Sequence, residues 1–193
     1  MKFFRRDKKP VPDEDPSESI KQLVKMVAGY VGYSNLENRK LTDSSLRGYL
    51  ANHLQKVVDK AAELQGLLIQ NQILAAWSTS GKVGALLKEI IKTLLDESEK
   101  HPFPRNYGFS TFFVTKKLEG ISTDILYFIE LDVVKNIEAI DIIIDAILQR
   151  LQTMDLVEIE GDVTTLYANV ESVRKTLHER AELIASFEKL DLS

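Results

Sequence analysis

The longest apolar stretch of the sequence, residues 118–151, constrains the fold more than any other feature. It contains no proline, and its only glycine is Gly120. Apolar residues recur along it at helical spacing, so it predicts one long helix that other helices must cover. At about 1.5 Å per residue, this helix would be about 50 Å long. Five charged residues between positions 121 and 140 make a membrane span too costly, so we expect a helix in a soluble bundle.

Four further segments have helical patterns, and each is preceded by a residue able to cap a first turn. The second pattern is expected to end at the STSG sequence, which would also cap the third. Residues 154–161, just before the last pattern, are expected to be extended. The four helices are expected at about 17–32, 42–77, 82–94 and 162–184, with candidate caps at Ser17, Thr42, 78–81 and Asp162.

The pattern as a whole predicts an all-α fold, an antiparallel bundle of about five helices of which three are long. Residues 17–193 are expected to form one domain, because a chain of this length needs only one core. Residues 1–16 begin with basic side chains and continue with an acidic, proline-rich run, which predicts a flexible arm. No apolar segment follows the basic start, so no secretory signal is expected.

Composition and motifs exclude several kinds of chemistry. The absence of cysteine excludes disulfides, thiolate zinc sites and cysteine nucleophiles, and it fits a cytoplasmic protein. A net charge of -4 provides no general attraction for nucleic acid. None of the three histidines follows a glutamate by three residues, as the metal sites of di-iron bundles require. We therefore expect no metal, no cofactor and no catalytic site.

Two polar residues are predicted to interrupt the core of the central helix. Projection at 100° per residue places Asp132 and Asn136 within the face formed by its isoleucines. The same projection puts Glu130, Glu138 and neighbouring acids on the opposite side, where they are expected to form a solvated stripe. An unpaired buried carboxylate is costly, so Asp132 is expected to have a cationic partner.

Other helices supply candidates for that polar core. His53 and Asn71 project onto the apolar face of the second predicted helix, and Arg174 and His178 lie at the edge of the last one. One interpretation is a hydrogen-bonded layer that sets the register of the helices. The other is a polar pocket that binds a small molecule or a metal, with a histidine able to titrate near neutral pH.

Two segments combine aromatic with basic side chains, and each has two interpretations. The loop between the third and fourth predicted helices either binds a partner or plugs the open end of the bundle. The amino-terminal arm either makes weak contact with an anionic membrane or is a solubilising tail. The residues concerned are His101, Phe103, Arg105, Tyr107 and Phe109 in the loop, and Phe3, Phe4, Arg5, Arg6, Lys8 and Lys9 in the arm.

These observations favour a non-enzymatic interaction or assembly module in the cytoplasm. Extensive helical surface without a complete active site is typical of a protein that binds a protein partner or a second copy of itself. A homo-oligomer formed through one long helix is therefore expected. The alternatives are a small-molecule or metal-binding bundle built around Asp132, and a protein that is peripheral to a membrane through its basic arm.

Overall fold

The computed structural model describes residues 15–33, 36–100 and 114–189, and all regular secondary structure in them is helical. This confirms the predicted all-α fold of five helices. Four of the helices are long rather than three, because the third predicted helix begins earlier and ends later than its sequence pattern indicates. They are α1 Pro16–Met26, α2 Leu36–Gln70, α3 Leu74–Lys100, α4 Val114–Gln152 and α5 Ile159–Lys189.

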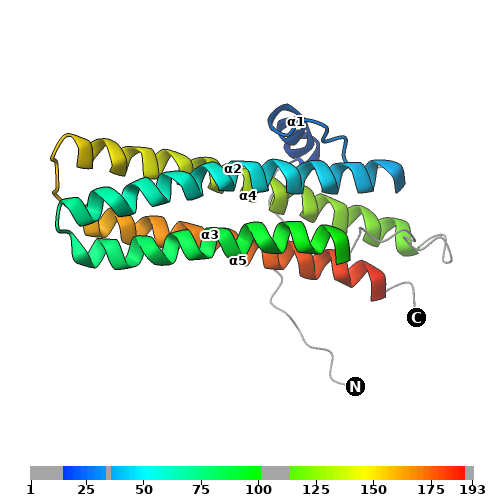
Figure 1. Ribbon diagram of the computed structural model, residues 1–193. Coiled ribbons are helices and arrows are strands. Elements are labelled where there is room, and N and C mark those ends of the chain that lie inside the picture. The colour runs from blue at the N-terminus through cyan, green and yellow to red at the C-terminus, as the bar shows by residue number, and fades with distance from the viewer. Residues whose placement is uncertain (1–14, 34–35, 101–113, 190–193) are drawn as a thin grey trace, which may run out of the picture.

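The four long helices form an elongated bundle made of two hairpins (Figure 1). α2 and α3 are joined by one tight turn, α4 and α5 by another, and both turns lie at the same end of the bundle. α2 packs against α3 and α4, and α5 packs against the same two helices, so α2 and α5 are diagonal partners. α2 and α4 run in parallel, since Tyr49 contacts Glu138 and Lys60 contacts Asp145.

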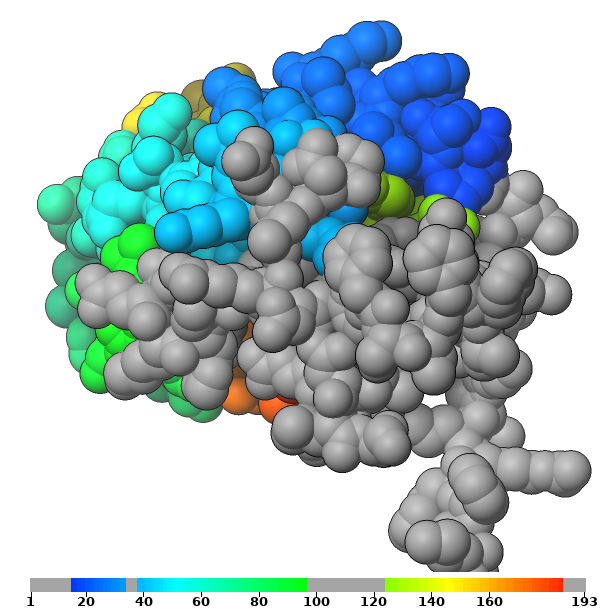
Figure 2. Space-filling model, turned by 90° about the vertical axis from the view of Figure 1, so that its right-hand side faces the viewer, coloured from blue at the N-terminus to red at the C-terminus, as the bar shows by residue number. Residues whose placement is uncertain are grey.

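The short helix α1 lies outside this square and packs against α4. Figure 2 looks at the end of the bundle opposite the two turns, where α1 in dark blue lies beside the yellow-green part of α4. No helix in the described part of the chain is long and apolar enough to cross a membrane.

The central helix α4 confirms the prediction from the apolar stretch. Its core-facing positions repeat at alternating steps of four and three, which is the heptad spacing of helices packed side by side. These positions are all buried, and one of them is a glutamate. They are Leu126, Glu130, Val133, Ile137, Ile140, Ile144, Ile147 and Leu151.

The STSG sequence does not break a helix, so that prediction is wrong. α2 ends at Gln70, where Ile73 N–H donates to the Leu68 carbonyl at 2.9 Å and Gln72 takes a left-handed φ of 60°. Gly81 lies inside α3, where an added Cβ would come within 2.8 Å of Gln65 Nε2 on α2. This glycine therefore lies at the contact between α3 and α2 and does not end a helix.

Three other helix boundaries also differ from the predictions. Asp15 rather than Ser17 caps α1, because its Oδ1 accepts from the Ser17 N–H at 2.9 Å and Pro16 fills the first helical position. α1 ends at Met26 and not near Gly32. The segment expected to be extended before α5 is a turn with left-handed backbone at Met154 and Glu158, and α5 begins before Asp162.

The connection between α1 and α2 is held by Thr42, which lies within α2 instead of capping it. Its hydroxyl donates to the Gly32 carbonyl at 2.9 Å and accepts from the Val31 N–H at 3.3 Å. Gly29 and Gly32 have φ of 83° and 80°, values that glycine adopts without the strain of a side chain. The chain can therefore turn tightly here and direct Tyr30 and Tyr33 into the bundle.

Candidate functional site

The predicted polar core around Asp132 does not exist. Asp132 is exposed and Asn136 is only half-buried. The error comes from the choice of face, because Ile125, Ile129 and Ile143, which helped to define it, are only half-buried. The buried residues of α4, such as Leu126, Glu130 and Val133, lie on the neighbouring face, and Asp132 lies outside that face.

The proposed partners of Asp132 lie elsewhere. His53 is half-buried, with its Nε2 3.9 Å from Asp141 Oδ2, and Asn71 donates to the Leu67 carbonyl at 2.9 Å. Arg174 and His178 are on the surface and contact glutamates on their own helix, Glu171 and Glu182. The structure therefore does not bring these residues together as a site.

Two other sets of predicted residues lie outside the described residues. They are the loop set His101, Phe103, Arg105, Tyr107 and Phe109, and the arm set Phe3, Phe4, Arg5, Arg6, Lys8 and Lys9.

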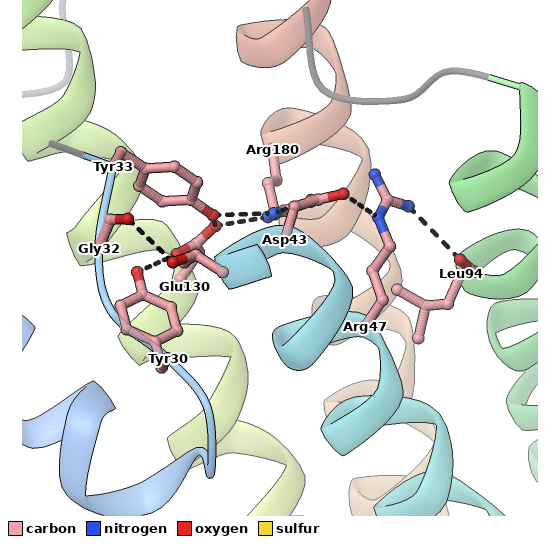
Figure 3. Close-up of polar contacts among 9 residues, drawn as sticks. Tyr30, Gly32, Tyr33, Asp43, Arg47, Leu94, Glu130 and Arg180 are labelled. Carbon is pink, nitrogen blue, oxygen red and sulfur yellow. Dashed lines mark hydrogen bonds and ion pairs between the residues drawn. The ribbon is translucent and has the colours of Figure 1, made fainter. Parts of the chain in front are cut away.

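The real polar core is centred on Glu130, which the sequence pattern had assigned to the solvated stripe. Its side chain is fully buried. The Tyr30 hydroxyl donates to Oε2 at 2.5 Å, while the Tyr33 hydroxyl and Arg180 Nε donate to Oε1 at 2.5 and 2.8 Å (Figure 3). The Tyr127 hydroxyl accepts from the Tyr33 N–H at 2.9 Å and so anchors that residue.

A second carboxylate continues the network. Arg180 Nη2 donates to Asp43 Oδ1 at 2.6 Å, and Arg47 Nε donates to Asp43 Oδ2 at 2.9 Å. Arg47 Nη1 reaches the Leu94 carbonyl of α3 at 3.5 Å. Two carboxylates and two guanidiniums balance in formal charge, so the cluster is neutral although it is almost entirely removed from solvent.

The cluster joins the four long helices and the connection between α1 and α2. Tyr30 and Tyr33 come from the α1–α2 connection, Asp43 and Arg47 from α2, Glu130 from α4 and Arg180 from α5, as Figure 3 shows. The contact between Arg180 and Asp43 crosses the diagonal of the bundle, between helices whose backbones do not pack together. Hydrogen bonds of this geometry form only when the helices are in one register, so the cluster selects that register.

Burial and neighbouring charge act on the two carboxyl groups with different results. Burial raises the pKa of Glu130 above its ordinary value, and Arg180 and the tyrosine hydroxyls only partly oppose this effect. Burial also acts to raise the pKa of Asp43, but Arg180 and Arg47 together outweigh it, and this pKa is lowered. Asp43 has two guanidinium partners where Glu130 has one, which explains the difference.

The tyrosines are held in their neutral form. Burial, followed by the negative charge of Glu130, raises the pKa of both Tyr30 and Tyr33 well above the usual range. All four carboxylate oxygens of Glu130 and Asp43 accept hydrogen bonds from tyrosine or arginine. The described residues contain no group of three or more side chains placed to bind a metal ion. The cluster thus acts as a clamp between helices and offers no free base.

A groove of about 490 Å³ opens between α3 and α5 beside this cluster. Three aliphatic side chains line it together with both arginines of the cluster. Its lining includes Ile90, Thr93 and Leu94 on α3, Leu177 and Arg180 on α5, and Arg47 on α2.

Exposed apolar side chains mark a second candidate surface. Six of the eleven large hydrophobic side chains that are exposed among the described residues surround the two turns. Ile142 on α4 is 70% exposed, and Ala146, one turn further along α4, lies in a shallow depression that α4 and α5 form beside that end. We call this set the assembly surface. It comprises Ile69, Leu74, Trp77, Ile142, Ile143, Ala146, Met154, Leu156 and Val157.

The sequence does contain a signal for the missed cluster. Glu130 occupies a core step of the four-three repeat on α4, and Arg180 occupies the equivalent step between Leu177 and Ile184 on α5. Asp43 and Arg47 lie four apart and lead into the buried repeat of α2. Projection at 3.5 residues per turn would have identified these charges as core residues.

Comparison of the chain with protein-family models, with curated proteins and with solved structures gave no match.

Proposed function

We propose that this protein is a non-enzymatic assembly module that self-associates through the assembly surface. The observation that supports the proposal is the concentration of exposed large hydrophobic side chains at the two-turn end and along the adjoining part of α4. Single exposed apolar residues are ordinary, but a cluster of them marks an interaction site. The partner that we propose is a second copy, related by a twofold axis so that each assembly surface covers the other.

The size of this surface sets the expected strength. The end of a four-helix bundle measures about 20 Å by 20 Å, and three turns of α4 add a strip about 16 Å by 10 Å. Each copy would therefore bury about 600 Å², which is below the roughly 800 Å² per partner of a standard stable interface. We expect a reversible dimer in the micromolar range rather than a permanent one.

Sedimentation velocity over a range of protein concentrations tests the proposal. The average mass of the wild-type chain should rise toward that of a dimer as concentration increases. Ile142→Asp and Val157→Asp should each keep the protein monomeric, because a carboxylate buried in the interface would lose its hydration. Leu41→Asp is the matched control, since Leu41 is 52% exposed but lies near the start of α2, far from the assembly surface.

Two results would refute this function. One is a wild-type protein that stays monomeric at the highest concentrations, and the other is a dimer that persists in both the Ile142 and Val157 variants. Circular dichroism of each variant should show unchanged helix content, so that loss of association is not confused with unfolding.

A further inference from the structure

The Arg180 guanidinium, beside the groove between α3 and α5, is a buried donor group that is incompletely satisfied. The Arg180 side chain is only 3% exposed, and its Nε and Nη2 donate to Glu130, Asp43 and Tyr33. Its Nη1 has no acceptor among the described residues. Because a guanidinium is planar, the N–H groups of Nη1 point away from the edge that carries Nε and Nη2. Arg180 also lines the groove.

We infer that this groove binds a small amphiphilic molecule that has an uncharged oxygen acceptor, such as a carbonyl, at one end of an aliphatic body. Buried donors without acceptors are costly, so an acceptor at Nη1 would be stabilised. Ile90, Leu94 and Leu177 supply the apolar wall for the aliphatic part. The groove volume of about 490 Å³ is within the roughly 300–1,000 Å³ of small-molecule sites.

The charge around the groove favours an uncharged ligand over an anion. Every arginine in its lining already contacts a carboxylate, so the groove provides N–H donors without excess positive charge. An anion would lose its hydration and gain little in return. The groove lining and the carboxylates that contact it contain no excess of cations. The four cations are Arg47, Arg174, Lys175 and Arg180, and the five carboxylates are Asp43, Glu89, Glu130, Glu171 and Glu179.

The test is a titration of the full-length, ¹⁵N-labelled protein with 2-octanone and, separately, with octanoate, followed by NMR. 2-Octanone should shift the amide signals of residues 90–94 and 174–180 together with the Nε–H signal of Arg180. Octanoate has the same chain length but ends in a carboxylate. It should bind at least about fivefold more weakly than 2-octanone, because its charge must be desolvated.

A pair of tryptophan variants locates the binding. Thr93→Trp places an indole in the groove and should abolish the shifts caused by 2-octanone. Thr164→Trp is the control, because Thr164 is also an exposed helical threonine whose hydroxyl donates to the carbonyl four residues earlier, yet it lies outside the groove. This variant should bind 2-octanone as the wild type does.

Three outcomes would overturn the inference. Tighter binding of octanoate would show an anion site. Shifts that persist in the Thr93 variant would place the ligand elsewhere, and the absence of saturable shifts with 2-octanone would show that the groove binds no such molecule. None of these results depends on self-association, which uses the opposite end of the bundle.

Discussion

Removal of the Arg180 guanidinium would test whether the buried cluster holds the fold together. Arg180→Met keeps an unbranched side chain of similar length but deletes three hydrogen bonds, to Glu130, Asp43 and Tyr33 at 2.8, 2.6 and 3.2 Å. Asp43 would still have Arg47 as a partner. Glu130 would keep only two tyrosine hydroxyls and would become a fully buried carboxylate without a counter-charge.

Breaking a buried pair in this way costs about 3–5 kcal/mol of the free energy of unfolding. That is a large part of the roughly 5–15 kcal/mol that a folded domain possesses. Arg174→Met is the matched control, because Arg174 contacts Glu171 on the same helix while 47% exposed, and it should change stability far less. Urea denaturation followed by circular dichroism at 222 nm measures both variants.

The loss in Arg180→Met should also depend on pH. Without Arg180 the pKa of Glu130, already raised by burial, rises further. A group whose pKa is raised on folding favours the folded state at low pH and loses that benefit as pH rises through the folded pKa. The stability deficit of Arg180→Met relative to wild type should therefore be smaller at pH 5 than at pH 8.

If Arg180→Met is no less stable than the Arg174 control, the cluster contributes little to the fold. A large loss that is the same at pH 5 and pH 8 would show instead that lost packing, and not an unpaired carboxylate, causes the destabilisation.

Two further predictions concern the cluster tyrosines and a helical glycine. Because the pKa values of Tyr30 and Tyr33 are raised on folding, the stability that these residues contribute is fully present below the unfolded pKa near 10 and falls as pH rises above it. Tyrosinate absorbance at 295 nm should therefore show their ionisation only together with loss of helix. Ionisation of all tyrosines before the helices unfold would contradict this prediction. Gly66→Ala should raise the free energy of unfolding by about 0.5–1 kcal/mol in urea denaturation, because alanine favours a helix more than glycine does. A Cβ at this position would meet no heavy atom of the surrounding structure within 4 Å. A loss of stability would contradict this prediction.

The sequence by itself determined the helical class and the central role of α4. Helix formation depends on local properties, namely apolar spacing and the absence of proline, and residues 118–151 show both over their whole length. The same local patterns located the buried repeats of α2 and α5. Helix ends were predicted less well, because Gln72 and Met154 adopt left-handed turns without the glycine that usually marks them.

Only the tertiary structure decided which charged residues are buried. Glu130 meets Arg180, Tyr33 and Tyr30 across sequence separations of 50, 97 and 100 residues, so no local pattern identifies these partners. The choice between Glu130 and Asp132 as the core residue depends on a rotation of α4 of less than one turn. Side-by-side packing set that rotation by imposing the heptad repeat, and it thereby turned an expected surface acid into the centre of the polar core.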